Sequence, residues 1–403
     1  MRDDSPKTPS GDRSSFGLRR RRVLQAAAGL SVSASASSWL LSHAARAQGE
    51  KAALQNPMIE RSQRPANYET PLDVFTTRIT PLQRFFVRNH FDLPTWLDPK
   101  AWRLQIDGLV EEPLSLGLGD LEQMPQTTVE AVLQCSGNGR ALFEPRMPGV
   151  QWKKGAFGNA RWTGVRLKDV LARARPKTAA RFVESQGYER PVIAKTPSFI
   201  RCIPVDKALH EDTLLALRMN DQPLSLAHGA PVRLIVPGWV GDDWIKFVQR
   251  LTFLPEESKA FYYATAYRFP TEPGAPGAPI PPEKMGPMTT MVVKSIIGSP
   301  LWGGTLQAGP QKVRGVAFSG GHGIAKVDVS VDGGKTWQAA SLDKGGRYGF
   351  SVFEHSFVAT PGPCTILSCA VDEKGNRQPG QARWNPSGYL HNAIDRVDTT
   401  VTA

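Results

Sequence analysis

Residues 269–282 read FPTEPGAPGAPIPP, and in this stretch proline and glycine outnumber all other residues together. Proline removes a backbone donor that a helix or central strand needs, and glycine adds backbone freedom. The stretch therefore predicts a linker, placed at residues 271–285, between domains at 48–270 and 286–403. A chain of 403 residues is long enough for two ordinary hydrophobic cores.

Upstream of the linker, strand and helix patterns are mixed. Strands are expected at Arg84–Val87, Val129–Leu133 and Val232–Val236, and a short helix at Leu167–Arg175, where apolar residues recur at helical spacing. This mixture predicts an α+β domain.

Downstream of the linker, the pattern is that of β structure alone. Residues 326–332 alternate, Gly333-Gly334 follows, and the chain resumes at Lys335, which predicts a hairpin. Further short strands are expected around residues 313–318, 348–353 and 365–371, with no helical period among them. The second domain is therefore predicted to be an immunoglobulin-like β-sandwich.

The amino terminus has the features of an export signal. Four arginines at 19–22 precede a mild apolar run at 26–41 and the cleavage pattern Ala45-Arg46-Ala47. We interpret residues 1–47 as a twin-arginine signal peptide and predict a periplasmic protein that is exported folded. Serines interrupt the apolar run, so no membrane span is expected. The alternative is a basic tail followed by a disordered Ala/Ser segment.

The charge balance is basic but scattered. The chain has 49 Lys and Arg against 37 Asp and Glu, a net charge of +12. Residues 1–47 carry 8 of the basic and 3 of the acidic residues, so their removal leaves +7. No run of lysines alternates with aromatic residues, which argues against nucleic acid and favours a small anion as the partner.

One of the four cysteines lies in an unusual loop. Residues 133–140 read LQCSGNGR, so Cys135 and Arg140 follow the end of a predicted strand. A nearby cation favours the thiolate form, and the loop predicts a metal ligand at Cys135. Cys364 and Cys369 are five residues apart in a predicted strand, so they lie on opposite faces and are not expected to form a disulfide.

Two further loops combine cations with histidine. Residues 88–90 read RNH, and residues 228–233 read HGAPVR, followed by the glycine-rich turn at 237–241 and Lys246. Such a turn with an arginine fork suits phosphate. Taken alone, a solvated loop and a structural β-arch explain these motifs as well. The motifs of zinc hydrolases, covalent haem and nucleotide-binding phosphate loops are absent from the sequence.

In combination, these motifs resemble the sulfite oxidase family from about residue 60 to the end. FVRNH at 86–90, the Cys135 loop, HGAPVR at 228–233 and VPG at 236–238 occur in that family's order. SGG at 319–321, VSVDGGKTW at 329–337 and WNPSGY at 384–389 resemble its carboxy-terminal dimerisation domain. The resemblance implies a mixed α/β molybdopterin-binding domain followed by an immunoglobulin-like dimerisation domain.

The resemblance also implies a cofactor and its ligands. Molybdenum would be bound by one molybdopterin, with Cys135 as the protein ligand, and no haem is expected in this chain. The implied cofactor-binding residues are Phe86, Val87, Arg88, Asn89, His90, Glu189, His228, Arg233, Trp244, Ile245 and Lys246. Glu189 stands where the family commonly has aspartate, and Trp244 is unusual at its place.

For the substrate, the resemblance implies catalytic roles for Arg88, Arg140 and Tyr267. Two guanidinium groups would desolvate and orient an oxyanion, and the neutral phenol would donate to the same oxygens. Tyr262 and Tyr263 are interpreted as packing residues. Gly139 stands where some members have a second arginine.

The implied reaction is oxidation of sulfite to sulfate by oxygen-atom transfer, with electrons leaving singly to an external c-type cytochrome, in a homodimer. The nearest alternative is a sulfane dehydrogenase subunit of a thiosulfate-oxidising complex. A methionine sulfoxide reductase is less expected because those relatives lack the sandwich, and nitrate reductases because they carry fused haem and flavin domains. A cofactor-free exported binding protein is the alternative from another class.

Overall fold

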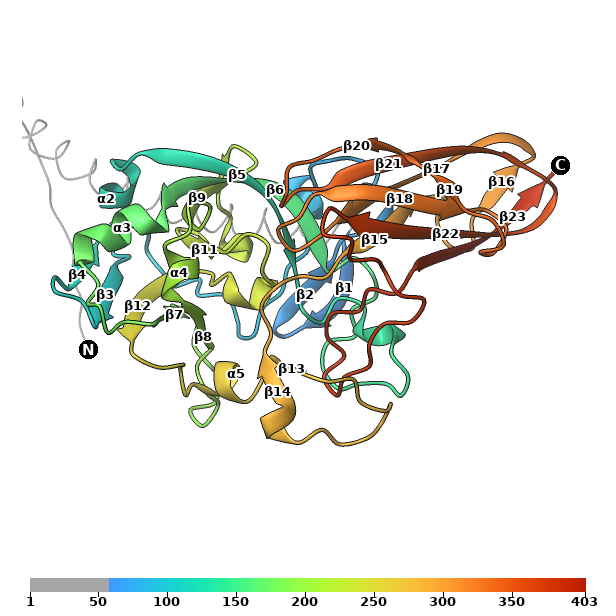
Figure 1. The fold of residues 1–403 in the computed structure, drawn as a ribbon. Helices are drawn as coiled ribbons and strands as arrows, with labels where there is room; N and C mark the ends of the chain where they lie inside the picture. The colour runs from blue at the N-terminus through green and yellow to red at the C-terminus, as the bar shows by residue number, and fades with distance from the viewer. Residues whose placement is uncertain (1–57) are drawn as a thin grey trace, which may run out of the picture. The chain divides into compact units, whose positions relative to one another are not determined.

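The computed structural model describes residues 58–403 (Figure 1). The predicted signal peptide at residues 1–47 lies outside the described residues. No helix within residues 58–403 is both long enough and apolar enough to cross a bilayer.

The part of the described chain that ends at Leu254 contains two five-stranded sheets. In the first, the order is β10-β9-β6-β5 and β11 also pairs with β9. In the second, the order is β4-β3-β12-β7-β8. The first sheet consists of β5 (Gln126–Gln134), β6 (Phe157–Arg166), β9 (Leu214–Met219), β10 (Gln222–Pro223) and β11 (Arg233–Ile235). The second consists of β3 (Leu104–Gly108), β4 (Leu114–Leu116), β7 (Phe182–Gly187), β8 (Ile200–Pro204) and β12 (Val248–Leu254).

The helices are short and lie mostly in connections. The expected helix at 167–175 is confirmed as α3 (Leu167–Ala174), whose apolar stripe is buried. Within residues 58–403 the other α-helices are α2 (Leu118–Glu122), α4 (Val205–Ala208) and α5 (Phe261–Ala264). The 3-10 turns are η1 (Leu72–Val74), η2 (Leu82–Arg84), η3 (Arg140–Leu142), η4 (Leu226–His228), η5 (Gly241–Asp243) and η6 (Pro282–Lys284). A separate hairpin is formed by β1 (Ile59–Gln63) and β2 (Ala66–Glu69).

The prediction of a strand at Arg84–Val87 is wrong. The turn η2 ends at Arg84, and only Val87 forms an isolated bridge, with Tyr68. A strand at the edge of a core alternates between buried and exposed residues, whereas Phe85, Phe86 and Val87 are all buried. The consecutive apolar residues instead fill an irregular segment that leads into the cavity described below.

The proline-rich stretch forms a loop between two short strands that pair with each other. The strand β13 (Arg268–Pro270) pairs with β14 (Met285–Pro287), and η6 lies just before β14. The predicted linker at 271–285 therefore contains a 3-10 turn, and its last residue begins a strand.

The last part of the chain is a sandwich of two sheets, as expected. One sheet has the order β15-β17-β21-β20 and the other β16-β23-β22-β18-β19. Their strands are β15 (Lys294–Ser299), β16 (Thr305–Gln307), β17 (Gly309–Phe318), β18 (Ile324–Ser330), β19 (Gln338–Ala339), β20 (Ser341–Asp343), β21 (Ser351–Ala359), β22 (Gly362–Asp372) and β23 (Asp395–Thr402). Ile297, Val327, Phe353 and Ile366 belong to the buried cluster of this region.

The hairpin predicted after residue 326 is confirmed, with a longer loop than the glycine pair suggested. β18 and β19 pair antiparallel across residues 331–337. In this loop the Asp332 carboxylate accepts hydrogen bonds from the backbone N–H groups of Lys335 and Thr336. Cys364 and Cys369 both lie on β22 and are free thiols, as expected. The observed architecture is thus the predicted α+β fold followed by a β-sandwich.

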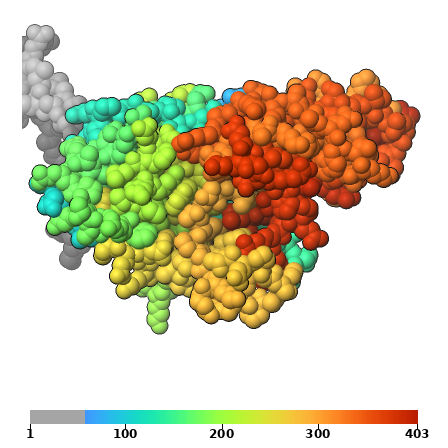
Figure 2. All heavy atoms as spheres, in the orientation of Figure 1, coloured from blue at the N-terminus to red at the C-terminus, as the bar shows by residue number. Residues whose placement is uncertain are grey.

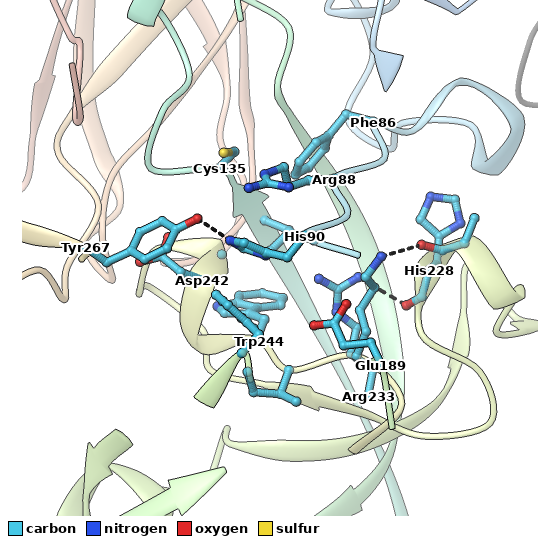
Figure 3. Close-up of a pocket in the computed structure, with 16 residues that line it drawn as sticks. Phe86, Arg88, His90, Cys135, Glu189, His228, Arg233, Asp242, Trp244 and Tyr267 are labelled. Atoms are coloured by element: carbon cyan, nitrogen blue, oxygen red, sulfur yellow. Dashed lines mark hydrogen bonds between the residues drawn. The ribbon is translucent and has the colours of Figure 1, made fainter. Parts of the chain in front are cut away.

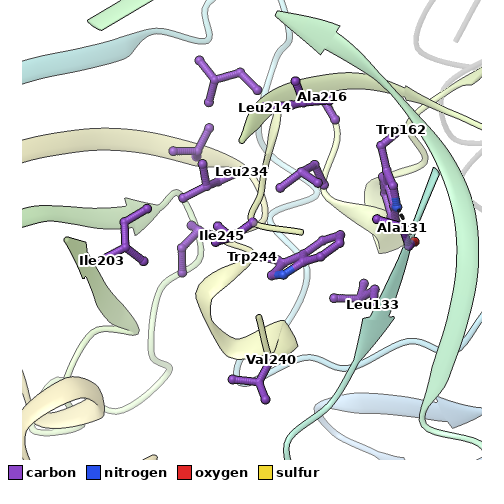
Figure 4. Close-up of a cluster of buried hydrophobic side chains, with 14 of the residues drawn as sticks. Ala131, Leu133, Trp162, Ile203, Leu214, Ala216, Leu234, Val240, Trp244 and Ile245 are labelled. Atoms are coloured by element: carbon purple, nitrogen blue, oxygen red, sulfur yellow. Dashed lines mark hydrogen bonds between the residues drawn. The ribbon is translucent and has the colours of Figure 1, made fainter. Parts of the chain in front are cut away.

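The largest hydrophobic core lies mainly in the first region and forms the support of the site. Figure 4 shows Trp244 packed among residues of several strands, with Trp162 and Leu133 beside it. The rings of Trp162 and Trp244 are 5.7 Å apart, edge to face. The Trp244 indole N–H donates to the carbonyl of Trp239 at 3.1 Å. Its buried polar atom is therefore satisfied, and its ring is fixed beneath the cavity.

Candidate functional site

A cavity of about 600 Å³, counted out to its mouth, lies above this core (Figure 3). Its walls come from segments far apart in the sequence. It is lined by Phe86, Arg88, His90, Leu133, Cys135, Glu189, Phe199, Ala227, His228, Arg233, Gly241, Asp242, Trp244, Ile245, Lys246 and Tyr267. Most of the residues that the sequence singled out are therefore brought together.

Cys135 lies directly after the end of β5, at the start of a tight turn. Its N–H donates to the carbonyl of Ala156 at 3.0 Å, and its own carbonyl accepts from the N–H of Asn138 at 2.9 Å. Burial raises the pKa of the Cys135 thiol, and Arg88 and Arg140 act in the opposite direction. A positively charged species beside the sulfur would therefore favour the thiolate.

Tyr267 and His90 form one wall of the site. The imidazole Nε2 of His90 is 2.5 Å from the phenol oxygen of Tyr267, as Figure 3 shows. The His90 ring also stacks on Phe199, with 3.8 Å between the centroids. Burial and the neighbouring Arg88 lower the pKa of His90 well below its ordinary value, so the imidazole is neutral.

The backbone of Tyr267 is held in a sparsely populated conformation. Its φ is +52°, in the left-handed region that a bulky residue rarely adopts. Its ring is stacked on that of Tyr389, with 5.4 Å between the centroids. Surrounding packing therefore holds the phenol in place at the expense of local strain, which is typical of functional sites.

The opposite end of the cavity is basic. Lys246 Nζ donates to Asn89 Oδ1 and, at 3.2 Å, to the carbonyl of Ala227. Arg233 Nη1 donates to the carbonyl of His228 at 3.1 Å. Burial lowers the pKa of Lys246 to about 7 and that of Arg233 to about 9. An anion placed between these groups would restore their charge, as a phosphate does.

Glu189 lies near these cations without pairing with them. Its side chain forms no hydrogen bond or ion pair within residues 58–403. Burial raises the pKa of the Glu189 carboxyl, while Lys246 and Arg88 act in the opposite direction. This carboxyl is thus available to a group that enters the cavity.

Asp242 is a wall residue that sequence reasoning missed. Both of its carboxylate oxygens are buried without a hydrogen bond, and its nearest charged partner is Arg201, at 3.7 Å. Arg201 Nε instead donates to Asp243 at 2.8 Å. Burial raises the pKa of Asp242. The pair of acidic residues after the glycine-rich turn at 237–241 was a signal that could have identified it.

Three of the predicted residues do not line this cavity. The Val87 side chain packs in a separate cluster with Met58 and Tyr68. Asn89 lies behind the wall, where its side-chain oxygen accepts from Lys246. The guanidinium of Arg140 donates to the carbonyls of Ser387 and Val150, at 2.9 and 3.0 Å.

The structure leaves no space for an arginine side chain at Gly139. Its φ is +90°, and a Cβ placed there would lie 2.6 Å from the Cβ of His391. The space that an arginine would occupy is therefore taken by the histidine, in a backbone conformation that favours glycine.

These features fit a metal-bearing organic cofactor. No group of three or more His, Cys, Asp or Glu residues that could hold a metal ion occurs within the described part of the chain. A metal at Cys135 would therefore take its other ligands from a bound molecule. Buried polar atoms without partners, at Arg233 Nε and on Asp242, remain for such a molecule to contact.

Comparison with known families gives two matches. The molybdopterin-binding domain of oxidoreductases matches residues 90–262. The dimerisation domain of Mo-co oxidoreductases matches residues 286–402.

The chain is also similar to individual proteins. Mitochondrial sulfite oxidase from Homo sapiens is 35% identical over 359 residues, which cover 85% of this chain and 65% of that protein. Sulfite oxidase from Arabidopsis thaliana is 31% identical, with 83% and 91% covered. The crystal structure of the sulfane dehydrogenase SoxCD from Paracoccus pantotrophus matches with a TM-score of 0.71 and 29% identity, covering 85% of this chain and 88% of that chain. The match to the human protein thus spans less than two thirds of its length.

Proposed function

The chain belongs to the sulfite oxidase family of molybdopterin oxidoreductases, and from that premise we propose that it oxidises sulfite to sulfate. The observation that carries this proposal is the cavity itself. It places a thiol, a guanidinium and a phenol at one end and two buried cations at the other. The first end suits a metal and an oxyanion, and the second suits the phosphate of a pterin.

The residues present fit a molybdenum-molybdopterin cofactor. Cys135 would bind the molybdenum, and Arg233 and Lys246 would bind the phosphate, with Glu189 contacting the pterin. When bound, the cofactor supplies the oxygen-atom transfer and accepts two electrons from the substrate.

The chain's own residues bind and orient the substrate in this proposal. The Arg88 guanidinium lies at the Cys135 end of the cavity and would bind the oxyanion. Burial raises the pKa of Tyr267, so its phenol keeps its proton and can donate to an anion. With His90 Nε2 donating to the phenol oxygen, the phenol proton would remain free to face the substrate.

Arg140 has a supporting role in this scheme. Its guanidinium bonds to backbone carbonyls and lies 5.3 Å from the centre of the Tyr389 ring. It lowers the pKa of Cys135 without lining the cavity. We therefore assign Arg140 to holding the loop and stabilising the thiolate, rather than to direct contact with sulfite.

The remaining assignments complete the proposal. Electrons would leave singly to an external c-type cytochrome, and the sandwich would mediate a homodimer, as its match to a dimerisation domain suggests. The arginine motif at residues 19–22 supports export to the periplasm.

A second candidate is a sulfane dehydrogenase, which acts on a sulfur group carried by another protein. The similarity to the sulfane dehydrogenase structure favours it. So does the loop between β7 and β8, which projects at the lower edge in Figure 2. On this loop, between Glu189 and Phe199 of the cavity, Val192 and Ile193 are 81% and 67% exposed. An exposed apolar pair beside the site suits contact with a protein.

The deciding experiment is turnover of the molybdenum-loaded full chain with ferricyanide as the electron acceptor. Rapid oxidation of free sulfite supports the sulfite assignment. Turnover only when a protein-bound sulfane is supplied would favour the second candidate. Protein from a cofactor-competent host that contains no molybdenum would contradict both.

A further inference from the structure

A second cavity, also of about 600 Å³ when the space at its opening is included, lies on the other side of the Cys135 loop. Cys135 lines the first cavity, whereas Gly139 of the same loop lines the second. The second cavity is lined by Gly139, Leu142, Lys154, Lys294, Ile296, Trp302, His391, Ala393, Ile394, Asp395 and Arg396. Trp302 is 61% exposed and Leu142 42% exposed, so the cavity is reached from solvent.

Lys294 is the unusual residue of this cavity. It is the first residue of β15 and is only 2% exposed. Within residues 58–403 its Nζ has no hydrogen-bond acceptor and no ion-pair partner. A buried ammonium group without a partner is costly, so a protein retains one where something else supplies the compensating charge.

The only acidic residue among those that line the cavity is already engaged. Asp395 Oδ1 lies 2.5 Å from Lys154 Nζ, and Asp395 Oδ2 accepts from the N–H of Ile297 at 2.8 Å. Lys154 also donates to the carbonyl of Arg396 at 3.0 Å. Asp395 therefore forms its ion pair with Lys154, and it acts on Lys294 only from beyond ion-pair distance.

The net field of the cavity is positive. Burial lowers the pKa of Lys294 to about 7, and Lys154 acts in the same direction against Asp395. Burial also lowers the pKa of His391 to about 3, so this imidazole is neutral and can donate from one ring nitrogen. An anion from solution would restore the charge of Lys294 and accept hydrogen bonds from these side chains.

We propose that this cavity is a second anion site, which binds a small tetrahedral oxyanion with Lys294 as its principal ligand. Inorganic phosphate and sulfate share this chemistry, and both fit the volume available. The site is distinct from the first cavity, because the loop from Cys135 to Arg140 separates the two.

Anion binding here would act on the Cys135 loop through its neighbours. His391 packs against Gly139, and the N–H of Leu390 donates to the carbonyl of Ser136 at 2.9 Å. Lys154, Lys294 and His391 lie far apart in the sequence and all line the cavity, so an anion that contacts all three would connect three segments of the chain. The expected consequence is greater stability of the folded chain in sulfate or phosphate.

The test is thermal unfolding of the full chain in sulfate, phosphate or chloride at equal ionic strength. Wild type should gain stability in both oxyanions with a saturating dependence on concentration, and not in chloride. A gain in melting temperature with sulfate but not with phosphate would identify a site selective for sulfate. An equal gain with phosphate would show that the site recognises the tetrahedral oxyanion shape that the two ions share. Both outcomes support the site.

Variants separate the two cavities. Lys294→Met should weaken the oxyanion response at least about tenfold without lowering the melting temperature in chloride, because it removes an unpaired buried charge. Lys154→Met, whose lysine is partly exposed, should weaken the response less. The control Lys335→Met removes an exposed lysine of the sandwich and should leave the response unchanged. Arg88→Met removes the cation that we assign to oxyanion binding in the first cavity, so the response that remains in this variant belongs to the second cavity.

The proposal is overturned if Lys294→Met and Lys154→Met respond as wild type does, or if the response disappears in Arg88→Met instead. It is also overturned if wild type shows no difference between oxyanions and chloride. None of these readouts requires turnover, so the result is independent of whether the chain oxidises sulfite.

Discussion

The Nε2 atom of His90 lies 2.5 Å from the phenol oxygen of Tyr267, although 177 residues separate them in the sequence. This contact joins the segment that follows the β1–β2 hairpin to the residue just before β13. It fixes the phenol beside Arg88 and Cys135 at one end of the cavity. Because His90 is neutral, the pair can orient a proton without adding charge to an anion site.

Loss of this phenol should slow the chemical step. We expect Tyr267→Phe to lower kcat by roughly 10²-fold or more, as is typical when a positioned proton donor is removed. KM for sulfite should change less than kcat. Steady-state kinetics with ferricyanide measures both values.

The matched control for Tyr267→Phe is Tyr262→Phe, at a neighbouring ring that meets His90 edge to face but does not line the cavity. It should leave kcat within about threefold of wild type, since it removes no positioned donor. Equal losses in the two variants would contradict the role assigned to Tyr267.

The two buried cations of the cavity should make stability depend on pH. Lys246 has a folded pKa of about 7, below that of an exposed lysine, so between that pH and about 10.4 the unfolded chain binds more protons than the folded chain. The contribution of Lys246 therefore increases stability as pH rises through this window, by at most about 1.4 kcal/mol per pH unit.

This dependence is isolated by comparing wild type with Lys246→Met. The free energy of unfolding is measured in urea on the cofactor-free proteins. The wild-type value minus the variant value should rise between pH 7.5 and 9.5, which lie within the window set by the shifted pKa of Lys246. A bound phosphate would restore the lysine's charge, so the slope should decrease in the cofactor-loaded protein. A difference that is flat with pH in the cofactor-free protein would contradict the shifted pKa.

The fold was predictable where sequence pattern and local packing agree. The helix at 167–174 and the alternation around residue 326 depend on periodicity alone, and both are confirmed. In the segment 84–87, Phe85 and Phe86 are buried in the main core and Val87 in a separate cluster, so consecutive apolar residues reflect tertiary packing and not a strand. Local sequence contains no information about which clusters these side chains join.

The site was predictable where a residue belongs to a motif whose side chains have a recognisable chemical role. Cys135, Arg88 and Tyr267 line the cavity together, although they come from three distant segments. The separation of Arg140 from the cavity depends on the carbonyls of Val150 and Ser387, which no spacing rule places there. Asp242 was missed for a similar reason, because its burial follows from tertiary packing.

The glycine at 139 should be intolerant of substitution. Gly139→Ala places a Cβ against His391 in a backbone conformation with φ of +90°, so a loss of about 1–3 kcal/mol is expected. Gly346→Ala is the control, because a Cβ there meets nothing within 4 Å. Urea unfolding compares the two, and equal stabilities would show that the loop adapts without cost.

The exposed pair on the loop between β7 and β8 should matter only for protein partners. The double variant Val192→Ser, Ile193→Ser should lower turnover with a protein acceptor or carrier while turnover of free sulfite with ferricyanide is kept. The control is Val358→Ser, at a side chain 73% exposed on the sandwich. A similar loss with both acceptors would instead indicate damage to the cavity.

The central claim is that Cys135 is the protein ligand of a pterin-bound molybdenum. X-ray absorption at the molybdenum edge, on wild type and on Cys135→Ser loaded with cofactor, tests it most directly. The account predicts that the variant retains molybdenum but loses a sulfur neighbour, together with sulfite oxidation. An unchanged sulfur shell in the variant, or full activity without the thiol, would contradict it.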